Sequence, residues 1–67
     1  MAVSFNPLWK LLIDKKMKKK ELARLAGVGE ATIYRMVQGQ NISTEVLEKI
    51  CRVLDCNVQD ILEFVDE

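Results

Sequence analysis

Between residues 19 and 38, apolar and polar positions follow the period of a helix more regularly than elsewhere in the chain. The spacing of the apolar positions is that of two short helices that bury side chains between them at a steep crossing: Leu22, Ala26, Val28, Ile33 and Met36. The positions between them are mostly polar or charged. The pattern predicts two helices, the second of which runs to about Gln38.

Three small residues fit this arrangement. Ala23 lies near the crossing, where a longer side chain would force the helices apart. Gly27 follows the first helix, where the backbone often turns left-handed and glycine avoids a Cβ clash. Gly29 permits the second helix to begin, with Glu30 placed favourably for the helix dipole. The stretch therefore predicts a helix-turn-helix.

Three further helices are predicted on the two sides of this motif. The first begins at Asn6 as N-cap and Pro7, ends near residues 15–16 and turns its leucines inward. The fourth begins after Ser43 as N-cap and also carries apolar residues at helical spacing. In the fifth, Asn57 and Asp60 form a capping box. The inward residues predicted for these helices are Leu8, Leu11 and Leu12; Leu47, Ile50, Cys51 and Leu54; and Ile61, Leu62 and Val65.

The segment ELARLAGVGEATIYRMVQGQ, preceded by Leu8, Leu11 and Met17 and followed by STEVLEKICRVLDCNVQDIL, resembles the Cro and phage-repressor (XRE-type) helix-turn-helix proteins. The resemblance covers nearly the whole chain and is closest to short single-domain members. It implies an all-α, compact five-helix lambda-repressor-like DNA-binding domain over residues 1–67, with the helix-turn-helix as helices two and three.

The resemblance also implies which residues contact base edges, because such proteins insert the start of the third helix into the major groove. Arg35 can bond the O6 and N7 atoms of guanine, or contact a phosphate instead. Tyr34 can contact DNA or cover neighbouring apolar surface. Glu30 departs from the neutral polar residue common in the family. It either accepts from a cytosine amino group or serves only as a charge at the helix start. The implied base-contact residues are Gly29, Glu30, Ala31, Thr32, Tyr34 and Arg35.

Phosphate contacts are expected at two places. Lys18, Lys19 and Lys20 crowd beside the free amides at the start of the second helix, where Lys18 replaces the usual serine cap. The loop after the third helix resembles the family's second phosphate clamp, although it lacks the frequent basic residues. Its residues are Gln38, Gly39, Gln40 and Asn41.

The formal net charge is zero, but the charges are unevenly distributed. Residues 1–41 carry eight basic and three acidic side chains, whereas residues 42–67 carry two basic and seven acidic ones. This polarity could orient the domain on DNA, and the alternative is an ordinary solvated charge pattern.

Composition limits the other functions. The chain has 67 residues and no histidine, and it shows no metal-ligand cluster or glycine-rich phosphate loop, so we expect no catalytic residue, cofactor, metal or small-molecule ligand. Cys51 and Cys56 are interpreted as small core residues, with a redox switch or a shared metal site as the alternative. No stretch has the length of a membrane span or the pattern of a signal peptide, which predicts a soluble cytoplasmic protein.

Four large apolar residues lie outside the positions predicted to form the core: Phe5, Trp9, Ile13 and Phe64. Either the first and fifth helices pack on each other through them, or they form a homodimer interface.

These features together predict a non-enzymatic, sequence-specific transcriptional regulator that binds double-stranded DNA as a dimer, in particular a repressor on a palindromic operator. The alternative is a protein-interaction module that keeps the fold without reading DNA.

Overall fold

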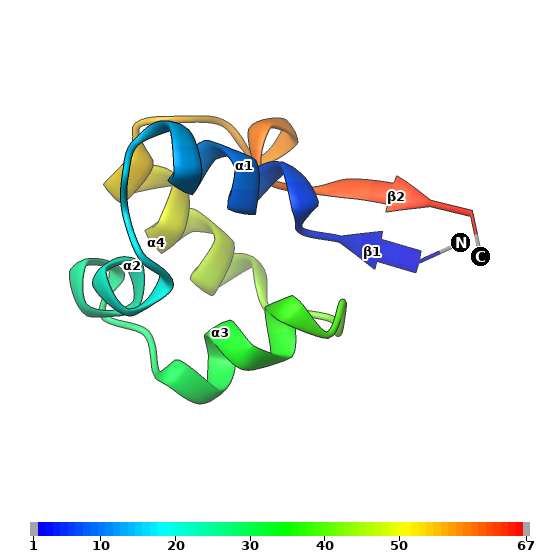
Figure 1. Cartoon of the computed structure of the whole chain (residues 1–67). Coiled ribbons are helices and arrows are strands. Elements are labelled where there is room, and N and C mark those ends of the chain that lie inside the picture. The colour runs from blue at the N-terminus through cyan, green and yellow to red at the C-terminus, as the bar shows by residue number, and fades with distance from the viewer. Residues whose placement is uncertain (1, 67) are drawn as a thin grey trace.

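Four α-helices, a short 3-10 helix and a two-stranded antiparallel sheet make up residues 2–66, which the computed structural model describes (Figure 1). The elements in chain order are β1 (Ala2–Ser4), α1 (Asn6–Asp14), α2 (Lys19–Ala26), α3 (Glu30–Val37), α4 (Thr44–Leu54), η1 (Val58–Asp60) and β2 (Glu63–Val65). The strands bring the two ends of the chain together, and they project from the helices on one side of the molecule (Figure 1).

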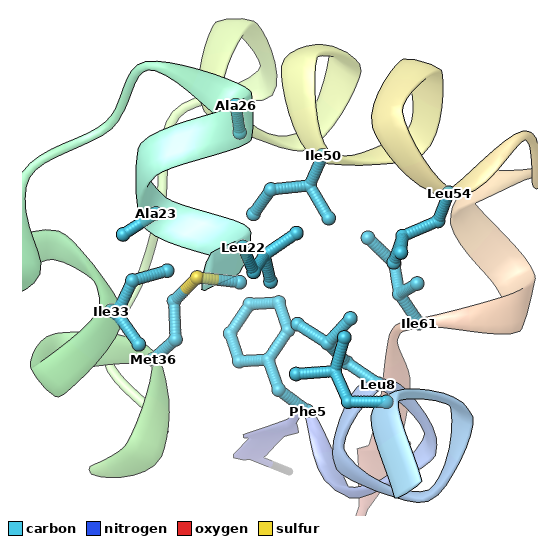
Figure 2. Packing of buried hydrophobic residues seen from close by; sticks show 11 residues of the cluster. Phe5, Leu8, Leu22, Ala23, Ala26, Ile33, Met36, Ile50, Leu54 and Ile61 are labelled. Carbon is cyan, nitrogen blue, oxygen red and sulfur yellow. The ribbon is translucent and has the colours of Figure 1, made fainter. Parts of the chain in front are cut away.

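The core lies between the four helices, and every α-helix contributes to it (Figure 2). Leu8, Leu22 and Ile50 have no exposed surface, and Met36 is only 1% exposed. The buried hydrophobic residues are Phe5, Leu8, Leu12, Leu22, Ala23, Ala26, Ile33, Met36, Ile50, Leu54 and Ile61. The predicted apolar frame of the helix-turn-helix is therefore confirmed, with Val28 packed at its edge.

All four α-helices end in the same way. A residue in left-handed conformation follows each last turn, and the next amide donates to a carbonyl five residues earlier, which satisfies an otherwise free helix end. Gly27 takes this position after α2, as predicted, with φ = 71°. The other left-handed residues are Lys16 (φ = 56°), Gly39 (φ = 73°) and Asp55 (φ = 52°).

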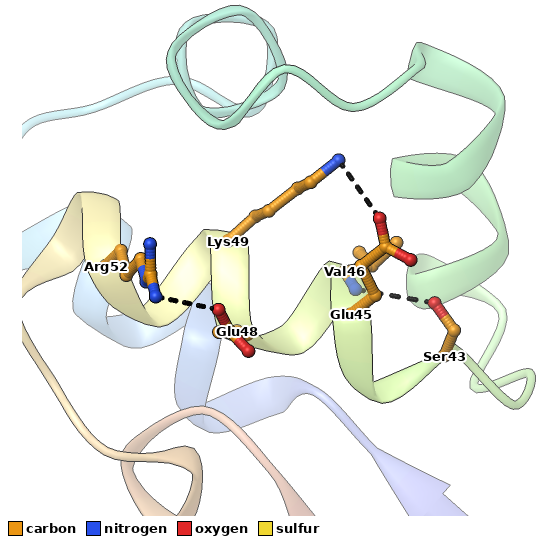
Figure 3. A network of polar contacts seen from close by, with 6 residues as sticks. All are labelled: Ser43, Glu45, Val46, Glu48, Lys49 and Arg52. Atoms are coloured by element: carbon orange, nitrogen blue, oxygen red, sulfur yellow. Dashed lines mark hydrogen bonds and ion pairs between the residues drawn. The ribbon is translucent and has the colours of Figure 1, made fainter.

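Side-chain caps differ between helix starts. Ser43 caps α4 as predicted, because its Oγ accepts from the amide of Val46 at 3.4 Å (Figure 3). The predicted N-cap at Asn6 is wrong by one residue, since Asn6 is already helical and its amide donates to the Oγ of Ser4 at 3.2 Å. The N-cap position is held by Phe5, whose ring the core requires.

The prediction of a fifth helix is wrong. The capping contact at Asn57 forms, since its amide donates to Oδ2 of Asp60 at 2.9 Å, but the helix is a single 3-10 turn. After it, Glu63–Val65 pair with Ser4–Ala2 as a strand. Of the predicted buried stripe only Ile61 is fully buried, whereas Leu62 is half-buried and Val65 is 38% exposed. The segment contains Phe64 and Val65, and aromatic and β-branched residues favour strands. Its backbone groups are paired with the distant strand β1 instead of within a helix.

The predicted packing of helix one on helix five through aromatic residues is consequently wrong as well. Phe5 is a core residue with 2% exposure, and Trp9 is half-buried on α1. Ile13, at the far end of α1, is 74% exposed. Phe64 lies on β2 opposite Val3 and is 65% exposed. The four residues therefore occupy different environments.

Within residues 2–66, no helix has both the length and the apolar character needed to span a bilayer.

Candidate nucleic-acid interface

One side of α3 is buried in the core and the opposite, outer side is exposed. Ile33 and Met36 anchor the helix in the core, and this fixes which residues face outward. Of the predicted base-contact residues, Thr32 is half-buried and the other five are exposed: Gly29, Glu30, Ala31, Tyr34 and Arg35. The structure thus places all six around one side of a single helix and its N-terminus.

Arg35 is held along this surface by its own helix. Its guanidinium donates from Nη2 to the Oγ1 of Thr32 at 3.3 Å, one turn earlier. Side chains in a helix lean toward its N-terminus, and this bond directs the guanidinium the same way. In helix-turn-helix proteins, that end of the second helix enters the major groove. Thr32 therefore positions Arg35 without needing to contact a base.

A shallow groove between α2 and α3 is lined by residues of both predicted kinds, those that contact phosphates and those that contact bases. Its lining includes Lys19 and Lys20 from the start of α2 and Glu30 and Tyr34 from α3. Val37, the last residue of α3, lines the same groove and precedes the loop at Gln38. Two of the three lysines predicted to contact phosphate, Lys19 and Lys20, consequently lie beside the helix predicted to contact bases.

Lys19 is less free than its two neighbours. Its Nζ lies 4.9 Å from the centre of the Trp9 ring, which is a cation–π contact between α2 and α1. No side chain caps α2, because Lys18 occupies the N-cap position with extended backbone. The first amides of α2 are therefore available to an anion, with Lys18 and Lys20 exposed beside them.

The loop after α3 is ordered by contacts to the rest of the fold. Gly39 adopts φ = 73°, and a Cβ atom there would lie 3.0 Å from the carbonyl oxygen of Val3 in β1. Gln40 donates through Nε2 to Oε1 of Gln38 at 2.9 Å, and its amide bonds the carbonyl of Arg35. Gln40 and Asn41 are exposed. The loop predicted to bind phosphate is thus tied to both α3 and β1.

The charges around the interface support contact with an anion. Among residues 2–66, the salt bridges all lie within α4, where Lys49 pairs with Glu45 at 3.7 Å and Arg52 with Glu48 at 2.9 Å (Figure 3). The two basic residues of the acidic half are thus engaged, whereas the eight basic residues of the first 41 positions form no salt bridge within the described range. Their charge is available to a ligand.

Glu30 is a carboxylate on the surface predicted to meet DNA. It lines a second hollow together with Lys20, Glu21 and Arg24 of α2. This lining holds two cations and two carboxylates, so the charges balance within the hollow. Sequence reasoning did not assign a contact to Arg24, whose proximity to Glu30 depends on the crossing of α2 and α3.

The remaining chemistry of the described residues is sparse. No group of three or more histidine, cysteine, aspartate or glutamate side chains in residues 2–66 is arranged to hold a metal ion. In the same range, every buried polar side-chain atom has a hydrogen-bond partner.

An exposed helix held across a second helix by a short turn, with basic side chains beside it, defines the class of helix-turn-helix domains. The comparisons agree with this class. A sequence model of the Cro/C1-type HTH DNA-binding domain matches residues 7–67, and the chain belongs to this family. Its fold is also that of transcriptional regulator VanUg, known from a crystal structure, with a TM-score of 0.94 and 45% sequence identity over 98% of this chain and 88% of that chain. No curated protein sequence matches significantly.

The family assignment makes this chain a DNA-binding protein of the transcription-regulator type. The resemblance inferred from ELARLAGVGEATIYRMVQGQ is thereby confirmed. The individual contact residues stay predictions.

Proposed function

We propose that this protein is a repressor that binds a palindromic DNA operator as a homodimer, with α3 of each subunit in the major groove. The observation that carries the proposal is the exposed outer side of α3, on which Arg35 is directed by Thr32 toward the N-terminus of the helix. In this proposal Arg35 bonds guanine, and Tyr34 contacts a thymine methyl group or a phosphate. Repression follows when the operator overlaps a promoter and the bound protein excludes polymerase.

The backbone contacts are proposed at the start of α2 and in the loop after α3. Lys18 and Lys20 are exposed beside free amides, and Lys19 reaches the same groove as Tyr34. Each phosphate that is neutralised makes log affinity fall by roughly 0.9 per unit of log salt concentration. With about four to six phosphates per subunit, binding should weaken steeply as salt is raised.

Dimerisation is part of the proposal because one helix-turn-helix reads too few base pairs to select a site in a genome. A two-fold dimer would place the half-sites about one helical turn apart. Phe64 and Val65 on β2 are exposed apolar residues on a strand that has one partner among the described residues. Two-stranded sheets are marginally stable in water, so a second copy that covers this strand would stabilise it. Binding to DNA also implies a cytoplasmic protein.

The proposal is tested by selecting duplexes from a random pool with the full chain, followed by affinity measurements of the enriched sequence at two salt concentrations. We expect an enriched sequence with inverted symmetry and a half-site spacing of about 10 base pairs. Affinity for both enriched and random duplexes should fall with salt. Enrichment without symmetry would contradict the dimer.

The same selection decides the alternative, a protein-interaction module on this fold. Glu30 on the exposed side of α3 and the uncharged loop at residues 38–41 are the features that favour it. Recovery of no sequence, together with the absence of a salt effect, would refute DNA reading and leave that alternative.

A further inference from the structure

The end of α4 places the two cysteines of the chain next to each other. Asp55 turns left-handed after the helix, with φ = 52°. The carbonyl oxygen of Cys51 then accepts from the amide of Asp55 and, at 3.1 Å, from the amide of Cys56. The two cysteines therefore hold the first and last positions of the hydrogen-bonded loop that ends the helix.

Side chains at these two positions of a helix end commonly contact each other. Cys51 and Cys56 are both half-buried and both pack against the edge of the core. The amide of Cys56 donates to the carbonyl oxygen of Cys51 at 3.1 Å, and this backbone bond keeps the two residues close together. A disulfide requires Cα atoms about 4.4 to 6.8 Å apart. Burial, and after it the nearby Cys51 thiol, raise the pKa of Cys56 to about 11.

We propose that Cys51 and Cys56 form a dithiol site that closes to an intrachain disulfide through exchange with a low-molecular-weight disulfide. The thiolate of one cysteine attacks a sulfur of the reagent, forms a mixed disulfide and releases one small thiolate. The second cysteine then attacks the protein sulfur of that mixed disulfide and releases the other. The two small thiolates take up the protons of the two cysteines, so the reagent is reduced by two electrons and the protein is oxidised by two.

The second step is intramolecular because the two cysteines are close together in one chain. Linked groups see each other at an effective concentration of about millimolar or higher, so at micromolar protein closure within one chain outcompetes bridging between chains. The resulting bond would link the last turn of α4 to the segment leading to η1 and β2, at the C-terminal end of α4 (Figure 1). It would leave the α2–α3 surface free.

The raised pKa of Cys56 gives the reaction a pH dependence. A thiolate is the attacking species, and at pH 7 Cys56 is almost entirely protonated. Closure is therefore slow at neutral pH and accelerates as pH rises toward 11. Asp60 raises this pKa and Lys15 lowers it, and other charged residues line the same hollow: Lys10, Asp14 and Asp55.

The experiment exposes the reduced full chain at micromolar concentration to oxidised glutathione at pH 8.5. We expect a monomer whose mass is lower by about 2 Da, because two hydrogen atoms leave. Its Tm should rise by roughly 5 to 15 °C, and a reductant should reverse the rise. Cys51→Ser and Cys56→Ser should each stop at a stable glutathione adduct without that rise.

The controls are Cys51→Ala and Cys56→Ala, which keep the site apolar in case a serine disturbs the fold. Phenylarsine oxide provides a second probe, since trivalent arsenic bridges two neighbouring thiols. The wild-type chain should bind one equivalent, and each single variant should bind none stably. Wild-type protein that accumulates doubly glutathionylated chains or interchain dimers, and that fails to bind the arsenical, would overturn the proposal.

Discussion

Arg35 and Glu30 carry opposite charges on the outer side of α3, and their different surroundings assign them different roles. Arg35 is bonded to Thr32 and otherwise exposed, so its guanidinium can reach a ligand. Glu30 shares a hollow with Lys20, Arg24 and a second carboxylate, Glu21, so it lies in a mixed-charge environment within the protein. We therefore infer that Arg35 is the main source of base discrimination.

Arg35→Ala should relax sequence preference. Loss of a bidentate contact to guanine lowers discrimination by about 1 to 3 kcal/mol at one base pair of each half-site. Competition between the selected operator and single-base variants of it measures this change. Arg52→Ala is the matched control, because Arg52 is an exposed arginine that pairs with Glu48 on α4.

Lys19→Ala should behave differently from Arg35→Ala. It should weaken binding to all duplexes alike and reduce the salt slope by about 0.9. If Lys19→Ala instead changed the preferred sequence while Arg35→Ala did not, the roles proposed for these two residues would be reversed.

At the scale of elements, all four α-helices end with the same backbone conformation, but different residues adopt it. Gly27 and Gly39 have no Cβ atom and adopt the left-handed conformation without steric cost. Lys16 and Asp55 adopt the same conformation although their Cβ atoms make it less favourable. Gly39 has an additional constraint, since its Cα faces the carbonyl oxygen of Val3. This close approach packs the loop after α3 against the terminal sheet.

Gly39→Ala should therefore destabilise the fold. The left-handed conformation of an alanine costs about 1 to 2 kcal/mol, and the 3.0 Å approach to Val3 adds to this cost. Urea unfolding followed by circular dichroism measures the change. Gly29→Ala is the control, because Gly29 has φ = −73° and no atom within 4 Å of an added Cβ. The lower entropy of the unfolded chain and the poorer N-cap act in opposite directions there, so the net effect should stay within about 0.5 kcal/mol of zero. Equal losses for both variants would show that the constraint at Gly39 is not specific.

Elements differed in how far local sequence could predict them. The helix-turn-helix was predicted closely because each of its buried positions has a nearby partner at helical spacing, as for Leu22, Ile33 and Met36. The last element was predicted wrongly because Ile61, Leu62 and Val65 also fit a helical stripe. Only pairing between Phe64 and Val3, which are far apart in the chain, distinguishes a strand from that helix.

At the scale of the whole molecule, charge and exposed apolar surface lie in different places. Five of the basic residues belong to α2, α3 or the N-cap of α2: Lys18, Lys19, Lys20, Arg24 and Arg35. Phe64 is exposed on β2, in the acidic part of the sequence formed by residues 42–67. A dimer through β2 would therefore leave the DNA-binding surface of each subunit open. Ile13 is the other large exposed residue predicted for a dimer contact.

Phe64→Ala should shift the protein toward monomer and reduce its affinity for the palindromic operator more than for a single half-site. If Phe64 is a central residue of that interface, its truncation should cost about 2 kcal/mol or more, as at other interface hot spots. Sedimentation equilibrium with and without DNA measures the association. Ile13→Ala is the control at an even more exposed position, on α1, and should leave association unchanged. A wild-type protein that stays monomeric on the operator would contradict the dimer.

The sequence by itself determined the helix-turn-helix, its glycine turn and the family, because these depend on contacts between residues close in the chain. The candidate DNA-contact residues came from the resemblance to the family and stay predictions, although the buried Ile33 and Met36 leave the α3 residues among them on its outer side. The tertiary structure decided what depends on distant partners: the strand made from the two ends, the burial of Phe5, the contact of Lys19 with Trp9 and the position of Glu30 beside Arg24. Such contacts arise from how whole elements cross, and no local periodicity encodes that crossing.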